Sequence, residues 1–214
     1  MKNVLVFDSE TTGLPIKGET YDKNFETFPH VVQLAWWING AYRNYIVKPD
    51  GWVIPAEATA IHGITTEHAL EVGEPFARIA DHFVHDCMIA DIIIGHNIYF
   101  DSSIIKANIL RMGMPNWYND IVEPAMDKTK RRCTMMKTIK FVDAKFENGR
   151  GGKFPKLEEL YFKLFAEDFP AHNALEDVKA TLRCTESLIA LGIIEIPAEN
   201  MGTDNVQQAI FENQ

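Results

Sequence analysis

Residues 31–47 have the sequence VVQLAWWINGAYRNYIV, and this stretch decides the fold. Val31–Ile38 is rich in β-branched and aromatic residues, and Ala41–Val47 follows it after the pair Asn39-Gly40. Asn and Gly tolerate the left-handed backbone that a two-residue hairpin turn requires. The stretch therefore predicts two antiparallel strands joined by a tight turn.

Strands and helices are predicted to alternate on both sides of this hairpin. Lys2–Asp8 predicts a buried strand with Asp8 at its carboxyl end, and Ala90–Ile94 predicts another that ends at Gly95. Apolar residues at helical spacing predict helices, with Gly or Pro after several of them, at residues 74–86, 100–112, 156–165 and 174–191. A hairpin followed by such alternation favours a mixed-sheet α/β domain.

Two stretches between these elements are less regular. Residues 117–142 are ambiguous, and we expect a short helix there and a strand around Cys133–Met136. The glycines within Glu147–Lys153 predict a mobile loop.

Length and composition indicate one soluble globular domain. The chain has 214 residues, of which 46% are hydrophobic and 24% are charged. We expect a domain over residues 1–192 and a loosely attached tail over 193–214, with no membrane-spanning segment and no signal peptide. The three widely spaced cysteines, Cys87, Cys133 and Cys184, form neither a disulfide framework nor a zinc pattern, so we expect a cytoplasmic location.

The charge is distributed unevenly along the chain. The net charge is −9, but residues 128–156 contain ten Lys or Arg against two Asp or Glu, so this segment is +8 and the remainder is −17. A local basic stripe can hold a phosphate backbone even in an acidic chain, although a solvated surface loop explains the same run of charge.

Asp8 and Glu10 are the first candidate metal ligands. Side chains two apart on a strand lie on one face, so both carboxylates can approach one cation. Hard divalent cations such as Mg²⁺ prefer oxygen ligands. An isolated D-x-E pair is common on surfaces, but here it ends an apolar strand and precedes the turn Thr11–Leu14.

Two further sites follow later in the chain. Asp101 is expected in the first turn of the helix after the strand that ends at Gly95, where the helix dipole also favours an acid. Asn173 with Glu176 predicts a reciprocal helix cap, which makes His172 and Asp177 neighbours across the helix start. Because an apolar pair usually occupies these two positions, a histidine with a carboxylate indicates chemistry, and a simple His–Asp surface contact is the alternative.

These sites together resemble the DEDDh exonucleases of the RNase H-like superfamily, which are named after four acids and a histidine. The motifs are Phe7–Leu14, Gly95–Asp101 and His172–Asp177, and Pro55–Thr65 is similar to a segment of the proofreading epsilon-subunit-like branch. The resemblance covers residues 3–190. A sister group has a tyrosine four residues before the last Asp, where this chain has Asn173.

The resemblance implies an RNase H-like α/β fold, with a mixed five-stranded sheet, an antiparallel hairpin and flanking helices. It implies a 3′-to-5′ exonuclease that uses two divalent ions, Mg²⁺ or Mn²⁺, and releases nucleoside monophosphates from DNA, at single-stranded or frayed ends. Asp8, Glu10 and Asp177 would bind one metal, Asp8 would also contact the second, and Asp101 would act on the second through water. His172 would take the proton from the attacking water.

The resemblance also implies a pocket for the terminal nucleotide. The positions that match the family's pocket residues are Thr11, Thr12, Gly13, Leu14, His62, Asn97 and Phe100. Leu14 would pack on a base face, and for Leu14 and Phe100 a role in the core is the alternative. Where the family often has an Asp, this chain has Cys133, and the neighbouring cations Lys130, Arg131, Arg132 and Lys137 are expected to favour substrate phosphates.

Two other functions stay open at this level. The same chemistry serves an exoribonuclease or oligoribonuclease, because the contacts that sense a 2′-hydroxyl are not visible in the sequence. A catalytically silent nucleic-acid-binding module is the alternative from another class, although such a module is expected to lose a carboxylate or the histidine. Gln207–Phe211 loosely resembles a sliding-clamp-binding pentapeptide, which is the only hint of a polymerase or clamp partner.

Overall fold

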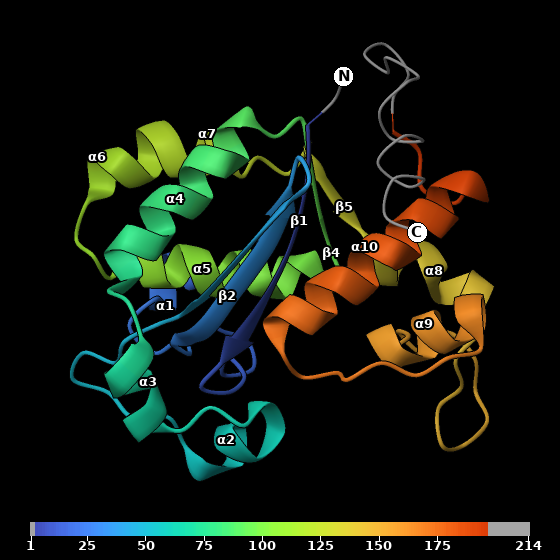
Figure 1. Ribbon diagram of the computed structural model, residues 1–214, viewed down its shortest axis with the longest axis horizontal. Coiled ribbons are helices and arrows are strands. Elements are labelled where there is room, and N and C mark those ends of the chain that lie inside the picture. The colour runs from blue at the N-terminus through green and yellow to red at the C-terminus, as the bar shows by residue number, and fades with distance from the viewer. Residues whose placement is uncertain (1–2, 197–214) are drawn as a thin grey trace.

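The computed structural model describes residues 3–196 and has a five-stranded mixed sheet with the strand order β3-β2-β1-β4-β5 (Figure 1). The strands are β1 (Val4–Thr11), β2 (Val31–Ile38), β3 (Ala41–Ile46), β4 (Ile92–Gly95) and β5 (Arg131–Cys133). β1 pairs antiparallel with β2 and parallel with β4. The architecture confirms the predicted RNase H-like α/β class.

The predicted hairpin is confirmed at its turn. Asn39 and Gly40 both have positive φ, at 48° and 83°, and β2 pairs with β3 from Ile38 to Gln33. Two consecutive positive φ values are the requirement of the turn that matches the twist of a hairpin, so a local sequence signal is sufficient here.

Helices cover both faces of this sheet. Those before β5 are α1 (Tyr21–Asn24), α2 (Ala56–His62), α3 (Thr66–Val72), α4 (Phe76–Ile89), α5 (Ile98–Leu110), α6 (Pro115–Trp117), the π-helix η1 (Tyr118–Val122) and α7 (Glu123–Ala125). Those after β5 are α8 (Thr134–Val142), α9 (Leu157–Phe165) and α10 (Ala174–Ala190).

The alternation of side chains along β1 divides the core into two layers. Leu5 and Phe7 belong to the large cluster that includes residues of α4 and α5, whereas Val6 packs with Ala174 and Val178 of α10. The two layers lie on opposite faces of the sheet, because successive side chains of a strand point to opposite faces. By the same alternation, residues 8 and 10 of β1 point toward the α10 face and residue 9 points toward the α5 face.

Two predicted strand positions need correction. β1 runs to Thr11 rather than ending at Asp8, because β2 pairs with it as far as Val31. The strand expected at Cys133–Met136 is wrong beyond its first residue. β4 ends at Gly95 opposite Cys133, so Thr134–Met136 have no neighbouring strand and begin α8 instead.

The N-terminal cap of α10 is confirmed in part. Oδ1 of Asn173 accepts a hydrogen bond from the backbone N–H of Leu175 at 3.1 Å. The reciprocal bond expected from Glu176 is wrong, because its carboxylate accepts a hydrogen bond from Lys179 instead, at 2.8 Å. The side-chain cation one turn further along the helix therefore replaces the backbone donor.

The C-terminal boundary lies at the limit of the described residues. Ile194 is buried, and Ile193 packs against the same cluster between α9 and α10. The boundary at residue 192 stays a prediction, and Gln207–Phe211 lies outside the described residues. Within residues 3–196, none of the helices has both the length and the apolar character needed to cross a membrane.

Candidate active site

Three of the predicted metal ligands meet on the α10 face of the sheet. Asp8 and Glu10 point there from β1, and Asp177 comes from the first turns of α10. One carboxylate oxygen of each lies within 4.8 Å of the other two. Asp177 follows Glu10 by 167 positions and Asp8 by 169, and it meets them because α10 packs across β1.

Asp101 approaches from the opposite face. It lies in α5 and is 4% exposed, and its Oδ1 accepts a hydrogen bond from the hydroxyl of Ser9 at 2.7 Å. β4 pairs with β1 only as far as Val6, so the carboxyl half of β1 has a free edge where α5 comes near it. Ser9 therefore connects Asp101 to the strand that carries Asp8 and Glu10. Sequence reasoning missed Ser9, although its alternation with Asp8 places it on the α5 face.

Burial and mutual repulsion raise the pKa values of all four acids. Burial and then the charge of Asp101 raise the pKa of Glu10 to about 7, and the same two causes raise that of Asp8 well above its usual range. Burial raises the pKa of Asp101 to about 7 despite the hydrogen bond from Ser9, and burial with the charge of Glu10 raises that of Asp177 to about 7.

This donor set fits divalent metal ions. Carboxylates gathered this closely repel one another unless a cation lies between them, and hard divalent cations take oxygen ligands. Asp8, Glu10 and Asp177 offer three such oxygens, with Asp101 beside them on the other face of β1. The four raised pKa values show that the ionised carboxylates destabilise one another, so a bound cation would stabilise the site.

His172 reaches Asp177 through its backbone and not through its ring. The His172 N–H donates to Oδ2 of Asp177 at 3.1 Å, with His172 in the left-handed region at φ 67°. Its imidazole is 57% exposed, and Nε2 lies 3.9 Å from Oε1 of Glu158. The expected neighbourhood of residues 172 and 177 is therefore present, while the ring stays accessible.

Glu158 and His96 are two neighbours of the site that sequence reasoning missed. Glu158 lies in the first turn of α9, and its charge contributes to the raised pKa of Asp177. His96 follows β4; Nδ1 lies 2.9 Å from the Thr134 hydroxyl and Nε2 lies 2.9 Å from the carbonyl oxygen of Pro155. His96 thereby fixes the chain just before α9. No local pattern signals either contact, because each one joins segments that are distant in sequence.

The turn after β1 is closed by its own side chains. The Thr11 hydroxyl lies 2.7 Å from the carbonyl oxygen of Gly13, to which it donates, and Oγ1 of Thr12 accepts from the N–H of His30 at 2.9 Å. Gly13 has a φ of 148°, which an L side chain rarely adopts. Leu14 is 83% exposed, so the alternative role in the core is wrong for this residue.

The other three expected pocket residues differ in their surroundings. His62 is buried, its Nδ1 accepts from the N–H of Ile64, and its Nε2 has no hydrogen-bond partner within the described part of the chain. Asn97 has a φ of 65° at the start of α5 and makes no side-chain cap. Phe100 is half-buried and packs against the large core cluster, which supports its alternative role in the core.

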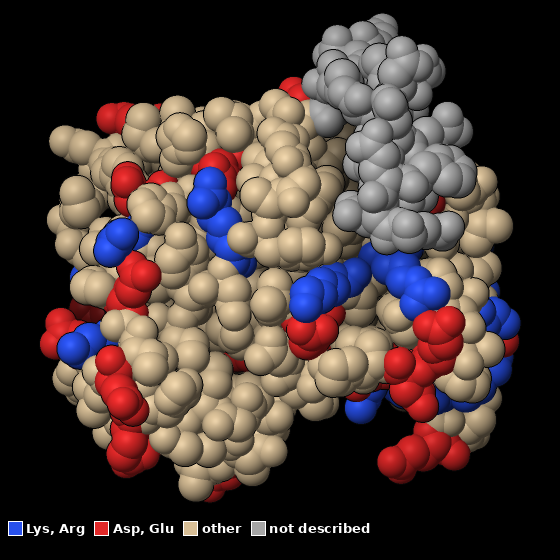
Figure 2. Space-filling view, viewed as in Figure 1, with Lys and Arg blue, Asp and Glu red and all other residues tan. Residues whose placement is uncertain are grey.

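The basic segment is only partly available to a ligand. Lys130 donates to the Cys87 carbonyl, and Arg132 donates to the carbonyls of Thr129 and Arg131. Lys137 is exposed on α8. Figure 2 shows acidic and basic side chains mixed at the lower right, over α8, α9 and the loop that joins them. The basic segment therefore lies in a surface of mixed charge, in which some of the cations are already engaged.

Comparison with known proteins agrees with this geometry. Residues 5–185 match a family model described as Exonuclease (RNase_T). None of the curated proteins matches the chain. Because the matched range contains Asp8, Glu10, Asp101, His172 and Asp177, every one of the predicted catalytic positions falls within it.

Several solved structures share the fold. E. coli Exonuclease I in complex with a dA16 oligonucleotide has a TM-score of 0.67 and 21% identity, covering 89% of this chain and 41% of that chain. Exonuclease I from Methylocaldum szegediense has a TM-score of 0.66 and 19% identity, with coverages of 89% and 41%. A complex of SSB and Exonuclease I with inhibitor CFAM has a TM-score of 0.67 and 20% identity, with coverages of 88% and 42%. The chain thus spans about 41% of the length of these Exonuclease I chains, and at such identities the likeness supports the fold.

Proposed function

The chain belongs to the Exonuclease (RNase_T) family, and from this membership we propose that it is a metal-dependent 3′-to-5′ exonuclease of the DEDDh type. The observation that carries the proposal is the convergence of Asp8, Glu10 and Asp177, whose oxygens lie within 4.8 Å of one another. Asp101 lies on the other face of β1, and His172 lies beside Asp177. Every acid and the histidine of the family pattern are therefore present.

The proposed reaction is hydrolysis of the terminal phosphodiester bond. Asp8, Glu10 and Asp177 would hold one divalent ion, and Asp8 and Asp101 would hold a second. Two such ions, when bound, lower the pKa of water and stabilise the attacking and leaving oxygens of an in-line displacement. The four carboxylates supply the negative charge that binds these ions, and Ser9 keeps Asp101 oriented through its hydrogen bond at 2.7 Å.

His172 is proposed as the general base. Its imidazole is exposed and makes no hydrogen bond to the carboxylates, so it is free to accept the proton of an incoming water at Nε2 or Nδ1. Its backbone N–H stays on Asp177, which keeps the base beside the metal ligands while the ring moves. A base within hydrogen-bond reach of the attacking water contributes about 10²- to 10⁴-fold to rate.

The terminal nucleotide is proposed to lie against the turn Thr11–Leu14. The exposed side chain of Leu14 offers an apolar face to a base, and stacking on such a face tolerates any sequence. His62 and Asn97 would supply polar contacts, because within the described residues His62 has an unpaired buried Nε2 and Asn97 makes no side-chain cap. Thr12 holds this turn to His30, so the turn is fixed before substrate binds.

DNA is the proposed substrate, with single-stranded or frayed 3′ ends. Two Exonuclease I structures with the same fold contain the oligonucleotides dA16 and dT13, which favours DNA over RNA. Another of these structures contains SSB together with Exonuclease I, and this supports a protein partner that meets the chain at single-stranded DNA. An oligoribonuclease is the second candidate, and a silent binding module is disfavoured because none of the four acids is missing.

One digestion experiment tests the proposal. Single-stranded DNA, duplex DNA and RNA of one sequence, each labelled at the 5′ end, are incubated with Mg²⁺, with Mn²⁺ and with chelator. We expect a ladder shortened from the 3′ end on single-stranded DNA, slower loss of the duplex, and no products in chelator. Faster degradation of RNA would reassign the substrate, and internal cuts or chelator-resistant products would contradict the mechanism.

A further inference from the structure

The loop between α8 and α9 combines aromatic and basic side chains at the edge of the site. Residues 143–156 contain Phe146 and Phe154, both exposed, at 39% and 53%. They also contain four cations, Lys145, Arg150, Lys153 and Lys156. Exposed aromatic rings interleaved with cations are typical of surfaces that bind single-stranded nucleic acid. The proposed function uses none of these residues.

The tip of this loop holds its shape through backbone hydrogen bonds. The Phe146 N–H donates to the carbonyl of Arg150 at 2.9 Å, and the Gly149 N–H donates to the carbonyl of Phe146 at 2.8 Å. Gly149 has a φ of 77°, which the turn requires. The Arg150 guanidinium lies 4.9 Å from the centre of the Phe146 ring. The tip therefore presents a flat ring and a cation together.

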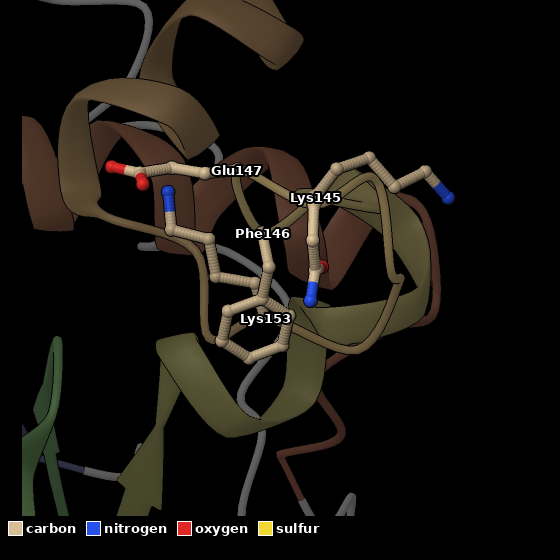
Figure 3. A pocket seen from close by; sticks show the side chains of 5 residues that line it. Lys145, Phe146, Glu147 and Lys153 are labelled. Carbon is tan, nitrogen blue, oxygen red and sulfur yellow. The ribbon is translucent and has the colours of Figure 1, made fainter.

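A hollow lies beside this ring. It has a volume of about 470 Å³ and is lined by Lys145, Phe146, Glu147, Asn148 and Lys153. In Figure 3 the side chains of Glu147 and Lys153 point toward one another across it, with the Phe146 ring close to the stem of Lys153. A hollow of this size, with one ring and several polar groups, suits a single nucleotide.

The cations of the loop are available to phosphates. Lys145 pairs with Asp143 at 2.5 Å and Lys153 with Glu159 at 2.9 Å, but all four side chains are at least 31% exposed. Such exposed pairs contribute little to stability, so a phosphate can replace the carboxylate at low cost. Arg150 has no carboxylate partner within residues 3–196.

The loop also leads directly to the proposed active site. The carbonyl of Pro155, near its end, accepts from Nε2 of His96, which is one residue before Asn97. The first turn of α9 then places Glu158 3.9 Å from His172. The end of the loop and the start of α9 are thus in contact with the segments that carry Asn97 and His172, which is the side from which a strand would continue toward the hollow.

We propose that this loop is a second nucleic-acid subsite, which binds an upstream nucleotide of the single strand by stacking its base on Phe146 and holding its phosphates with Lys145, Arg150 and Lys153. The proposal rests on the proposed function for the direction of the strand. The loop would increase the affinity for longer strands and would take no part in the hydrolysis.

The test measures binding with the full chain in an Asp8→Asn background, so that hydrolysis does not follow binding. Dissociation constants are measured by fluorescence anisotropy with Mg²⁺ for a dinucleotide and for a single strand of about 12 nucleotides, within the usual range of site sizes. Phe146→Ala is expected to weaken binding of the longer strand by about 5- to 150-fold, the range of base–aromatic stacking. Tyr42→Ala, which removes an exposed ring of β3 at the other edge of the sheet, is the matched control and should have no effect.

Two further arms separate stacking from charge. A strand with abasic upstream positions should bind weakly to the unmodified loop, and Phe146→Ala should not weaken it further. Replacing Lys145, Arg150 and Lys153 by Gln should reduce the slope of log Kd against log salt by about 0.7 for each phosphate of the single strand that the loop no longer neutralises. Lys48→Gln, at an exposed lysine two residues after β3 and so near the sheet edge opposite β5, serves as the control for charge.

The outcomes distinguish this subsite from the proposed function. If wild type degrades DNA but Phe146→Ala and the triple Gln variant bind the long strand as tightly as the Asp8→Asn parent, the subsite is wrong and the exonuclease stands. If wild type degrades no strand, the proposed function fails, and the binding constants still decide the subsite. Binding of an acidic peptide that the loop variants weaken, together with no effect of these variants on oligonucleotide binding, would assign the loop to a protein partner and overturn the proposal.

Discussion

The backbone N–H of His172 donates a hydrogen bond to Oδ2 of Asp177 at 3.1 Å, while Nε2 of its imidazole lies 3.9 Å from Oε1 of Glu158. The proposed base and a proposed metal ligand are thus connected by a contact that does not depend on the side chain of residue 172. Substitution of the ring should therefore separate proton transfer from metal binding.

His172→Asn tests this separation. Asn tolerates the left-handed backbone at φ 67°, and the N–H to Asp177 remains, so we expect unchanged thermal stability and unchanged stabilisation by Mg²⁺. The value of kcat should fall by about 10²- to 10⁴-fold, because the general base is lost. Loss of Mg²⁺ binding together with activity would show that the ring supports the metal site instead.

Ser9→Ala tests the link between the two faces of β1. It removes the donor to Asp101 at 2.7 Å in a buried position, which should cost about 1–3 kcal/mol of unfolding free energy. Partners that orient metal ligands typically account for about 10- to 100-fold in metal affinity or activity, so we expect a loss in that range. Ser103→Ala is the control, because its hydroxyl bonds only within α5 on an exposed surface. Equal effects of the two substitutions would remove Ser9 from the site.

Stability of the metal-free protein should fall as pH rises through about 7. The pKa values of Glu10, Asp101 and Asp177 are raised to about 7, so these acids bind protons more tightly in the folded chain than in the unfolded chain. Their contribution is fully present below the unfolded pKa values of about 4 and is lost as pH rises through the folded values. Denaturant unfolding at about pH 5 and about pH 8, in chelator and with Mg²⁺, measures the effect.

Asp177→Asn isolates the carboxylates in that experiment. His30 acts in the opposite direction, because burial and the charge of Arg111 lower its pKa to about 4. The slope of wild type alone therefore mixes both effects, whereas the difference between wild type and Asp177→Asn does not. Asp177→Asn should lose less stability on raising the pH and gain less from Mg²⁺. Identical profiles for the two proteins would contradict the shared cation site.

Gly95→Ala tests the close packing of β4 against β1 and α5. A Cβ at Gly95 would lie 3.2 Å from Cβ of Ile98 and 3.3 Å from the carbonyl oxygen of Phe7, so these neighbours must shift by a few tenths of an ångström. We expect a cost of about 1–3 kcal/mol and a loss of activity. Gly151→Ala meets the flexible end of Lys145 at 3.3 Å and Oδ1 of Asp143 at an ordinary 3.6 Å, so its thermal stability should change little. Equal stability of both variants would contradict this packing.

Features that depend on adjacent residues could be predicted from the sequence. The hairpin rests on Asn39-Gly40, and the pair Asp8 and Glu10 rests on the alternation of one strand, so both are found as expected. Asp177 shares a helix start with His172, which local capping also predicts. These cases need no knowledge of which elements become neighbours in the folded chain.

Features that depend on distant elements could not be predicted in this way. The end of β5 at Cys133 depends on the length of β4. The His172 ring lies 3.9 Å from Glu158, which precedes it by 14 residues. Local capping predicts a bond from Glu176 to the backbone, but the lysine at position 179 competes for the same carboxylate. In each case a partner outside the local pattern decides the outcome.

The most direct test of the central claim is the rate of 3′-end removal by wild type, Asp8→Asn and His172→Asn on one single-stranded DNA, with Mg²⁺ and with chelator. The carboxylate cluster and the histidine predict ladders for wild type with Mg²⁺ alone, no detectable product for Asp8→Asn, and a loss of about 10²- to 10⁴-fold for His172→Asn. Degradation that survives chelation, or that proceeds at the wild-type rate in either variant, would contradict the proposed site.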